Sequence, residues 1–260
     1  MSRESNRYII VFIVIVCISC ASVLSILAHL LAKPQAAQKE LYLSKQLLIA
    51  ADLIQPDQKL SQDNILNLYN ERVEMRLTNN EGDVLTFEEL GIDPTAYLHD
   101  NEKTGYANLQ YKLIYIVKGE NQQPDAYVLP INGYGLWDAI YGYLAIKTDG
   151  DTVIGTTWYE QAETPGLGGE IATAKWQAQF PGKLIFQESP SGTTDYQSAP
   201  LGIRVVKSTV EQELGDKPAA KSAVDGISGA TKTGEGVTDA YRSSLAPYRA
   251  FLIRIHEGNP

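Results

Sequence analysis

The most marked pattern in the chain is an unbroken apolar run near its start, from Tyr8 to Ala32. These 25 residues contain no Lys, Arg, Asp or Glu. At about 1.5 Å per residue, a helix of this length exceeds the roughly 30 Å core of a bilayer. A cleaved signal peptide has an apolar stretch of only about 7–15 residues, and bulky Leu30 and Leu31 beside charged Lys33 disfavour cleavage here. The pattern predicts an uncleaved transmembrane helix over residues 8–32, after a short tail at 1–7.

Beyond this span, apolar positions recur at helical spacing in three further stretches. Residues 35–53 are expected to continue the first helix and to end near Pro56. A second helix is expected after a cap at Ser61 or Asp63. Its apolar residues are Ile65, Leu68 and Val73. Residues 236–255 predict a third helix, which Pro247 kinks or divides.

Short runs of β-type residues lie between the second and third helices. Two of them, 141–146 and 152–158, flank Asp149-Gly150 and predict a hairpin that turns there. The other predicted strands are 111–117, 126–131, 183–186 and 203–206. Helices that flank an antiparallel sheet define an α+β fold. After the span we expect a helical and strand region at 33–129, a functional domain at 130–255 and a C-terminal tail at 256–260.

The composition narrows the possible chemistry. A net charge of −9 argues against a nucleic-acid partner, and three His residues in all argue against a His-rich metal site. Both cysteines, Cys17 and Cys20, lie in the apolar run, so residues 33–260 contain no disulfide, Cys zinc site or Cys nucleophile. We expect no metal site and no catalytic residue on this chain.

The two cysteines allow more than one interpretation. They lie three residues apart, on one face of the predicted helix, where they would bind a metal or cluster together with partner helices. The favoured alternative is that these small residues let another helix approach closely. Lipid attachment at Cys20 is disfavoured because Cys17 occupies the position where a lipobox has Leu.

The densest cluster of small and polar residues is Asp225–Gly236, which reads DGISGATKTGEG. Small residues before a helix expose backbone N–H groups, which together with the helix dipole favour a phosphate. The stretch is not a Walker loop, since Glu235 stands where Lys is required, and it lacks the second Gly of a nucleophile elbow. A Gly-rich turn capped by Ser and Thr is the alternative.

Two other stretches have unusual composition. Glu163–Glu170 reads ETPGLGGE and predicts a loop whose backbone approaches a flat ligand, or else an ordinary loop. Pro130–Gly142 reads PINGYGLWDAIYG, and we expect its aromatic residues to lie in the core rather than to form a stacking platform.

Taken together, SGAT at 228–231, ETPGLG at 163–168 and GLW at 135–137 resemble the C subunits of the bacterial Na+-translocating NADH:quinone reductases. The resemblance runs from the apolar run to about Leu252 and is sharpest from Pro130 onward. The G subunit of the Rnf electron-transport complex is similar in two of these elements. GLWDAIYGYLA and the long region before it resemble the reductase more.

The resemblance implies a covalent FMN, and an FMN-binding domain at 130–255. In that family the Thr ending the tetrapeptide, here Thr231, carries FMN through a phosphoester bond that a flavin transferase makes from FAD with Mg2+. Ser228, Gly229 and Ala230 match the recognition motif of that transferase, and Asp225 matches its acidic start. The implied flavin-lining residues are Thr164 and Leu167, with Gly166 and Gly168 shaping their loop, and Lys207. KTGEGV after Thr231 departs from the family pattern, as does Ser208 after Lys207.

The implied function is electron transfer between redox centres of neighbouring subunits in a membrane Na+-translocating NADH:ubiquinone oxidoreductase. Enzyme activity would belong to the complex, because no GxGxxG follows a strand to bind NADH. The resemblance also implies a single-pass protein of the bacterial inner membrane, with the soluble domain in the periplasm and the other subunits as partners. The alternatives are an Rnf-type subunit, a membrane-tethered flavin-binding sensory module, and a hydrolase using Ser228 with His256 or His99.

Overall fold

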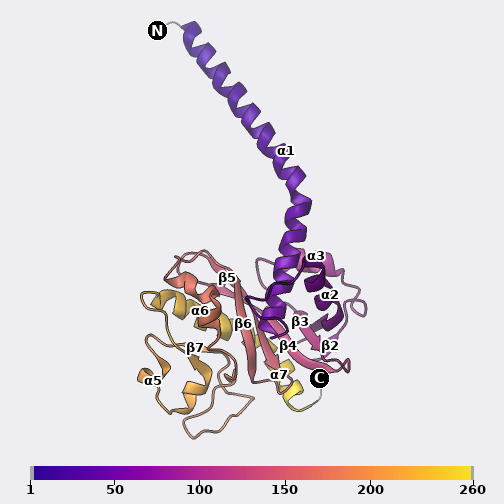
Figure 1. Ribbon diagram of the computed structural model, residues 1–260, viewed down its shortest axis with the longest axis vertical. Helices are drawn as coiled ribbons and strands as arrows, with labels where there is room; N and C mark the ends of the chain where they lie inside the picture. The colour runs from indigo at the N-terminus through magenta and orange to yellow at the C-terminus, as the bar shows by residue number, and fades with distance from the viewer. Residues whose placement is uncertain (1–2, 259–260) are drawn as a thin grey trace. The chain divides into compact units, whose positions relative to one another are not determined.

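The structure, a computed structural model, describes residues 3–258 and begins with one long helix, α1, at Arg3–Ala50. The helix passes through Pro34, so the predicted span and its continuation form one element, which ends at Ala50 rather than near Pro56 (Figure 1). Residues 3–7, expected as a tail, are helical, whereas Met1, Ser2, Asn259 and Pro260 lie outside the described residues. Among the described residues, α1 is the one helix long and apolar enough to cross a membrane.

The chain divides into two compact units, one ending at Leu43 and the other beginning at Ser44. The second unit is built on a six-stranded sheet in the order β2-β1-β3-β4-β5-β6, in which every neighbouring pair is antiparallel. The strands are β1 Val73–Thr78, β2 Val84–Leu85, β3 Lys112–Lys118, β4 Pro124–Tyr134, β5 Ala139–Lys147 and β6 Val153–Glu160. The expected boundary between residues 129 and 130 falls inside β4, so both expected regions contribute strands to one sheet.

The predicted hairpin at Asp149-Gly150 is confirmed. The Asp149 carboxylate accepts the backbone N–H groups of Asp151 (2.9 Å) and Thr152 (2.8 Å), and Gly150 adopts φ +74°. An Asx turn with a glycine in the left-handed region is the local chemistry that reverses the chain between β5 and β6.

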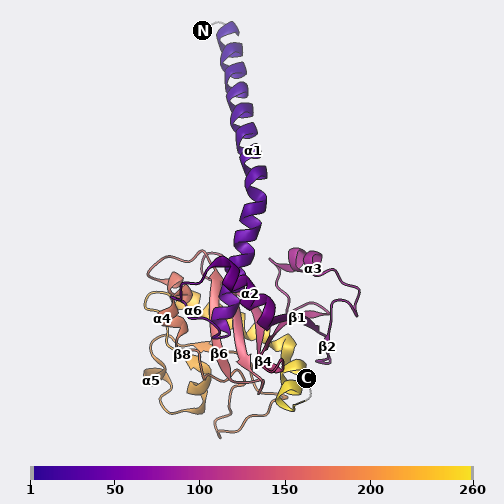
Figure 2. The same ribbon diagram turned by 45° about the vertical axis from the view of Figure 1, so that its right-hand side comes forward.

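Alternation along the strands sends side chains into two cores. In β3, Leu113, Tyr115 and Val117 enter one core while Ile114 enters the other. The first core also contains Leu47 and Ala50 from the end of α1. The second contains Tyr241 of α6 (Thr231–Leu245) and Phe251 of α7 (Arg249–His256). In Figure 2, α2 (Gln62–Arg72) lies in front of the strands, and the yellow C-terminal helices lie behind them.

Several helical predictions hold with small changes. Ser61 caps α2 by accepting the N–H of Asn64 (3.2 Å), but Val73, assigned to that helix, begins β1. The C-terminal helix begins at Thr231 rather than Gly236, and Pro247 divides it through a 3-10 turn, η3, at Ala246–Tyr248. The remaining helices are α3 Pro94–Asn101, α4 Ala174–Gln177, α5 Val210–Glu213, and the 3-10 turns η1 Gly168–Ala172 and η2 Pro218–Ser222.

Two strand predictions need correction. Residues 183–186 make only isolated bridges, through Leu184 to Thr152 and through Phe186 to Leu201. Residues 203–206 shorten to β7, Arg204–Val205, which pairs in parallel with β8, Ala223–Val224. Both segments are apolar because they pack into the core (Ile185, Phe186 and Ile203 are buried), and burial alone does not require a long ladder.

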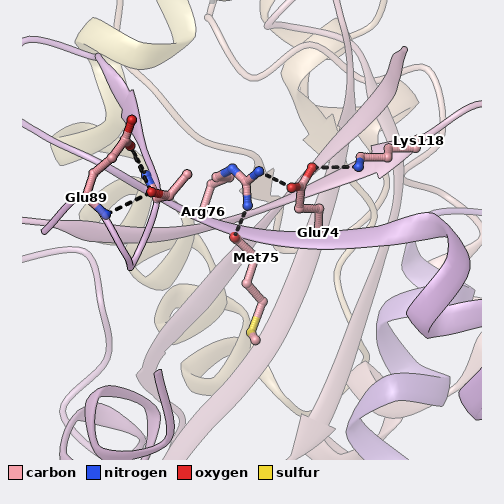
Figure 3. Close-up of polar contacts among 6 residues, drawn as sticks. Glu74, Met75, Arg76, Glu89 and Lys118 are labelled. Carbon is pink, nitrogen blue, oxygen red and sulfur yellow. Dashed lines mark hydrogen bonds and ion pairs between the residues drawn. The ribbon is translucent and has the colours of Figure 1, made fainter. Parts of the chain in front are cut away.

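The β1–β3 side of the sheet carries a network of charged side chains. Glu74 on β1 pairs with Arg76 on the same strand and with Lys118 at the end of β3 (2.9 Å), as Figure 3 shows. The three side chains remain 27–28% exposed. Partial burial opposes ionisation of Glu74, but the bonds and charges of Lys118 and Arg76 outweigh it, so the pKa of Glu74 is lowered.

Candidate functional site

Three loops meet beyond one end of β4, β5 and β6. They are the β4–β5 loop (135–138), the loop after β6 (161–167) and the loop before α6 (225–230). The Trp137 indole N–H donates to the Thr164 hydroxyl (3.2 Å), which joins the first loop to the second. A Cβ placed on Gly229 would lie 2.9 Å from Leu167 Cδ2, which brings the third loop against the second. The three stretches that stand out in the sequence therefore form one site.

Thr231 is the first residue of α6, and it is exposed. The residue before it, Ala230, has a methyl side chain without an acceptor for the N–H groups of the first turn. Gly229 adopts φ +76°, which lets the chain turn sharply into the helix. The arrangement presents a hydroxyl beside unpaired N–H groups and the positive end of a helix dipole, which suits an ester of phosphoric acid.

The loop after β6 forms a tight turn from Thr164 to Leu167. The N–H groups of Leu167 (3.1 Å) and Gly169 (3.0 Å) both donate to the Thr164 carbonyl, and Gly166 sits at φ +75°. Thr164 and Leu167 are exposed on this turn, whereas Gly168 is buried at the start of η1. The turn thus offers one hydroxyl and one apolar side chain next to Gly229.

The aromatic residues of the stretch 130–142, at the end of β4, in the β4–β5 loop and on β5, do not lie in the core, which corrects the expectation for this stretch; Tyr141 on β5 is half-buried. Tyr134 is 76% exposed and Trp137 69% exposed, and Leu136 between them is also exposed. The Gly135 N–H donates to the Asp138 carbonyl (2.9 Å), so the loop projects past the sheet as a closed turn. We call these exposed side chains and Leu167 the apolar rim. Trp137, through its bond to Thr164, and Leu167, against Gly229, place exposed apolar surface beside the site, able to stack against a flat ring.

Glu163, in the loop after β6, is only 5% exposed. Its Oε1 accepts the Trp137 backbone N–H (2.9 Å), and its Oε2 accepts the Thr233 hydroxyl from the first turn of α6. Burial disfavours the ionised form. The Thr233 hydroxyl and then the N–H groups of Trp137, Leu136 and Asp138 outweigh this, so the pKa of Glu163 is lowered. The sequence pattern alone assigns this residue no role.

The last residues of α1, which belong to the second unit, pack against β6. A Cβ on Gly155 of β6 would lie 2.6 Å from the Ala50 carbonyl oxygen, and the Thr157 hydroxyl donates to the Gln46 carbonyl (3.2 Å). The end of α1 therefore runs antiparallel to β6: Gln46 lies against Thr157, and Ala50 lies against Gly155. The chain enters the second unit toward the end of β6 that leads into the site.

Comparison with known proteins gives a consistent result. A family model described as an FMN-binding domain matches residues 135–246. The C subunit of the Na(+)-translocating NADH-quinone reductase of Chlamydia muridarum is 33% identical over 290 residues, covering 94% of this chain and 91% of that protein. This chain belongs to the family of reductase C subunits.

Two further relatives support the family and the fold. The C subunit from Chlamydia caviae is 43% identical over 192 residues, covering 68% of this chain, which spans 60% of that protein's length. The crystal structure of the C subunit from Parabacteroides distasonis is 27% identical, with a TM-score of 0.62, and covers 85% of this chain and 96% of that one. The predicted α+β fold, an N-terminal apolar helix followed by an antiparallel sheet with helices, is confirmed.

In this member of the C-subunit family, the predicted site residues lie on the three loops and at the start of α6, but the side chains of Asp225 and Lys207 need separate description. Asp225 uses its carboxylate within the fold, to accept the Val210 N–H (2.7 Å) at the start of α5. The backbone of Lys207 lies against the loop before α6: a Cβ on Gly226 would lie 2.8 Å from the Lys207 carbonyl oxygen. The Lys207 side chain is exposed, and after the closer Lys232 its charge helps to lower the pKa of Glu235 on α6.

The geometry contradicts the hydrolase alternative in the form that uses His256. The His256 Nδ1 lies 2.8 Å from the Asp149 carbonyl oxygen, in the turn that joins β5 to β6. That turn is at the opposite end of β5 from the site, roughly 30 Å away for nine residues in a strand. The distance from this turn to the site therefore excludes His256 as the residue that activates Ser228. His99 lies on α3 beside Asp100 (3.2 Å).

The chemistry of the clustered groups fits a flavin mononucleotide. Thr231 and the start of α6 offer an ester oxygen and N–H donors for its phosphate, while Leu167 and Trp137 offer exposed apolar surface for its ring. Within residues 3–258, no group of three or more His, Cys, Asp or Glu side chains is arranged to hold a metal ion.

Proposed function

We propose that this chain carries FMN and transfers electrons within a membrane-bound Na+-translocating NADH:quinone reductase. The single observation that carries the proposal is the exposed Thr231 at a helix start, two residues after Gly229, which lies against Leu167 of the apolar rim. The match of residues 135–246 to an FMN-binding domain, and the names of the relatives, support the same cofactor and complex. Those names favour the reductase over an Rnf-type subunit.

The proposed attachment uses the Thr231 hydroxyl as a nucleophile. Its Oγ1 forms a bond to the phosphorus of the FMN half of FAD, the bond between the two phosphates breaks, and AMP leaves as the hydroxyl gives up its proton. A separate flavin transferase with Mg2+ supplies the catalysis. Ser228, Gly229 and Ala230 are small, so a second protein is able to enclose the threonine. The N–H groups of the first turn of α6 hold the remaining negative charge.

The bound flavin would supply the redox chemistry, since it accepts and donates single electrons. The protein's own contribution is position. Leu167 and Trp137 keep apolar surface against the ring, and the ester keeps the cofactor in place where no free FMN is available. We further propose that electrons arrive from one neighbouring subunit and leave to another.

The proposed location is the bacterial inner membrane, with α1 crossing it once and the second unit on the periplasmic side. The apolar residues 8–32 of α1 support the crossing. The chain enters the second unit toward the end of β6 that leads into the site. This supports electron exchange at that end of the second unit. The partners in this arrangement are the other subunits, the lipid bilayer and, during maturation, the transferase.

Substitution of Thr231 tests the proposal. We expect the full chain, produced together with a flavin transferase, to show fluorescence on a denaturing gel and a mass increase on the peptide that contains Thr231. Thr231→Ala removes the oxygen, so both signals should vanish. Thr193→Ala, at an exposed loop threonine outside the site, is the matched control and should keep both. An adduct retained by Thr231→Ala would refute the attachment.

A further inference from the structure

Two threonines on the first turn of α6 point in opposite directions. Thr231 is exposed and Thr233 is 1% exposed. Successive helical residues are rotated by about 100°, so residues two apart are rotated by about 200°. Fixing Thr233 toward the interior therefore sets the face on which Thr231 emerges.

Thr233 is fixed by a hydrogen bond to Glu163. Its hydroxyl donates to Glu163 Oε2, and the other carboxylate oxygen accepts the Trp137 N–H (2.9 Å). One buried carboxylate thus ties the start of α6 to the loop that carries the apolar rim. These partners lie 70 and 26 residues from Glu163 in the chain, so the carboxylate joins distant segments.

Two glycines leave space for this carboxylate and little more. A Cβ on Gly135 would lie 2.4 Å from Glu163 Oε1. A Cβ on Gly168 would lie 2.7 Å from Glu163 Oε2 and 2.4 Å from the Thr233 hydroxyl oxygen. Neither glycine needs a positive φ, so its role is to admit the carboxylate rather than to bend the chain.

We propose that Glu163 is a positioning residue for the Thr231 site, acting through Thr233 and the Trp137 loop. The ionised carboxylate holds the α6 rotation that presents Thr231 outward, and holds the apolar rim at a fixed place relative to it. This inference rests on the proposed function, because its consequence is measured at Thr231.

The test removes the hydroxyl without changing the shape of the side chain. Unmodified full chain in detergent is mixed with a flavin transferase, FAD and Mg2+, and adduct formation on the Thr231 peptide is followed by mass spectrometry. Thr233→Val should slow the reaction by about tenfold to a hundredfold, because misplacement by about 1 Å has effects of that size. Thr233→Ser keeps the hydroxyl and should react at close to the wild-type rate.

A double substitution tests whether the two residues act through each other. Glu163→Ala should be slow, and adding Thr233→Val to it should change the rate little, because the shared bond is already absent. Independent effects that multiply would overturn the proposal. So would a wild-type rate for Thr233→Val, or a rate for Thr233→Ser as slow as that of Thr233→Val.

Hydrogen exchange on the unmodified chain gives a readout that does not require the flavin. The Trp137 amide donates to Glu163, so it should exchange at least about tenfold faster in Glu163→Ala and faster in Thr233→Val. Unchanged exchange in both variants would also overturn the proposal. Failure of the proposed function has a different signature: no adduct on the wild-type chain, or an adduct that persists in Thr231→Ala.

Discussion

Glu163 and Glu74 are both carboxylates with a lowered pKa, but the two ends of the sheet hold them in different ways. Glu163 is almost completely buried, and its partners are a hydroxyl and backbone N–H groups. Glu74 is 28% exposed, and its partners are the cations of Arg76 and Lys118. The neutral donors around Glu163 come from separate segments and fix those segments relative to one another. The long cationic side chains around Glu74 supply charge at a partly exposed place and fix little.

This difference in partners and burial indicates that Glu163, rather than Glu74, fixes the positions of the segments around it. Loss of Glu163 leaves the buried Thr233 hydroxyl and the part-buried Trp137 N–H without a partner, which costs free energy until water or movement satisfies them. Loss of Glu74 leaves Arg76 and Lys118 in contact with solvent. Four measurements distinguish the two ends of the sheet.

The largest expected effect is that of Glu163→Ala. It leaves the buried Thr233 hydroxyl and the part-buried Trp137 N–H unpaired, which should lower the free energy of unfolding by about 2–4 kcal/mol. Urea unfolding of the full chain in detergent, followed by circular dichroism, measures this. A loss below about 0.5 kcal/mol would show that Glu163 has no greater structural weight than a surface residue.

Gly168→Ala should have the next largest effect. The added methyl would lie 2.7 Å from Glu163 Oε2 and 2.4 Å from Thr233 Oγ1, and both atoms are held by their shared hydrogen bond. Overpacking of this kind costs about 1–3 kcal/mol, measured by the same urea unfolding. Gly182→Ala is a comparison site for backbone strain: its Cβ would meet nothing within 4 Å, but its φ of +81° costs about 1–3 kcal/mol, so it separates strain from crowding of Glu163. The two differ in the Trp137 amide, which should exchange faster only in Gly168→Ala.

Acid should weaken the site end of the sheet through Glu163. Because its folded pKa lies below the usual value of 4.5, its contribution is complete above about pH 4.5 and is lost as the pH falls through the folded pKa. The wild type should therefore exceed Glu163→Gln in stability at pH 7, and this difference should shrink as the pH falls from about 4.5 to about 3. A difference that stays constant over that range would contradict an ionised Glu163.

Glu74→Ala should have the smallest effect. A partly exposed ion-pair network contributes about 0–1 kcal/mol, and salt screens it. Wild type and variant compared in about 0.05 M and about 1 M NaCl should differ less at the higher concentration. If Glu74→Ala destabilised the chain as much as Glu163→Ala, the distinction between the two carboxylates would fail.

Local chemistry made parts of this molecule predictable. The Asp149-Gly150 turn, the Ser61 cap and the division of the last helix at Pro247 each depend on residues within a few positions of one another. The start of the same helix was not predicted, because α6 begins at Thr231 and the apolar pattern begins only at residue 236. Patterns of this range are visible in a sequence because the interacting atoms are neighbours in the chain.

The rest of the site depends on contacts between distant segments. Glu163 acquires its role only when the β4–β5 loop and α6 converge on it, and no spacing in the chain signals that meeting. The large apolar surface of Trp137 predicts a core position, yet a closed turn carries this residue past the sheet. The apolar segment 183–186 predicts a strand, because burial and strand pairing leave the same pattern.

The burial of Leu47, Leu48 and Ala50 decides where a water-soluble fragment of this protein has to begin. These residues belong by sequence to the long first helix, but by packing to the globular unit. A fragment trimmed at Ile54 would lose them, open a hollow beside the strands and be prone to aggregate. A fragment that starts a few residues before Ser44 would lack the apolar membrane-spanning residues but keep the helix end that fills its own core.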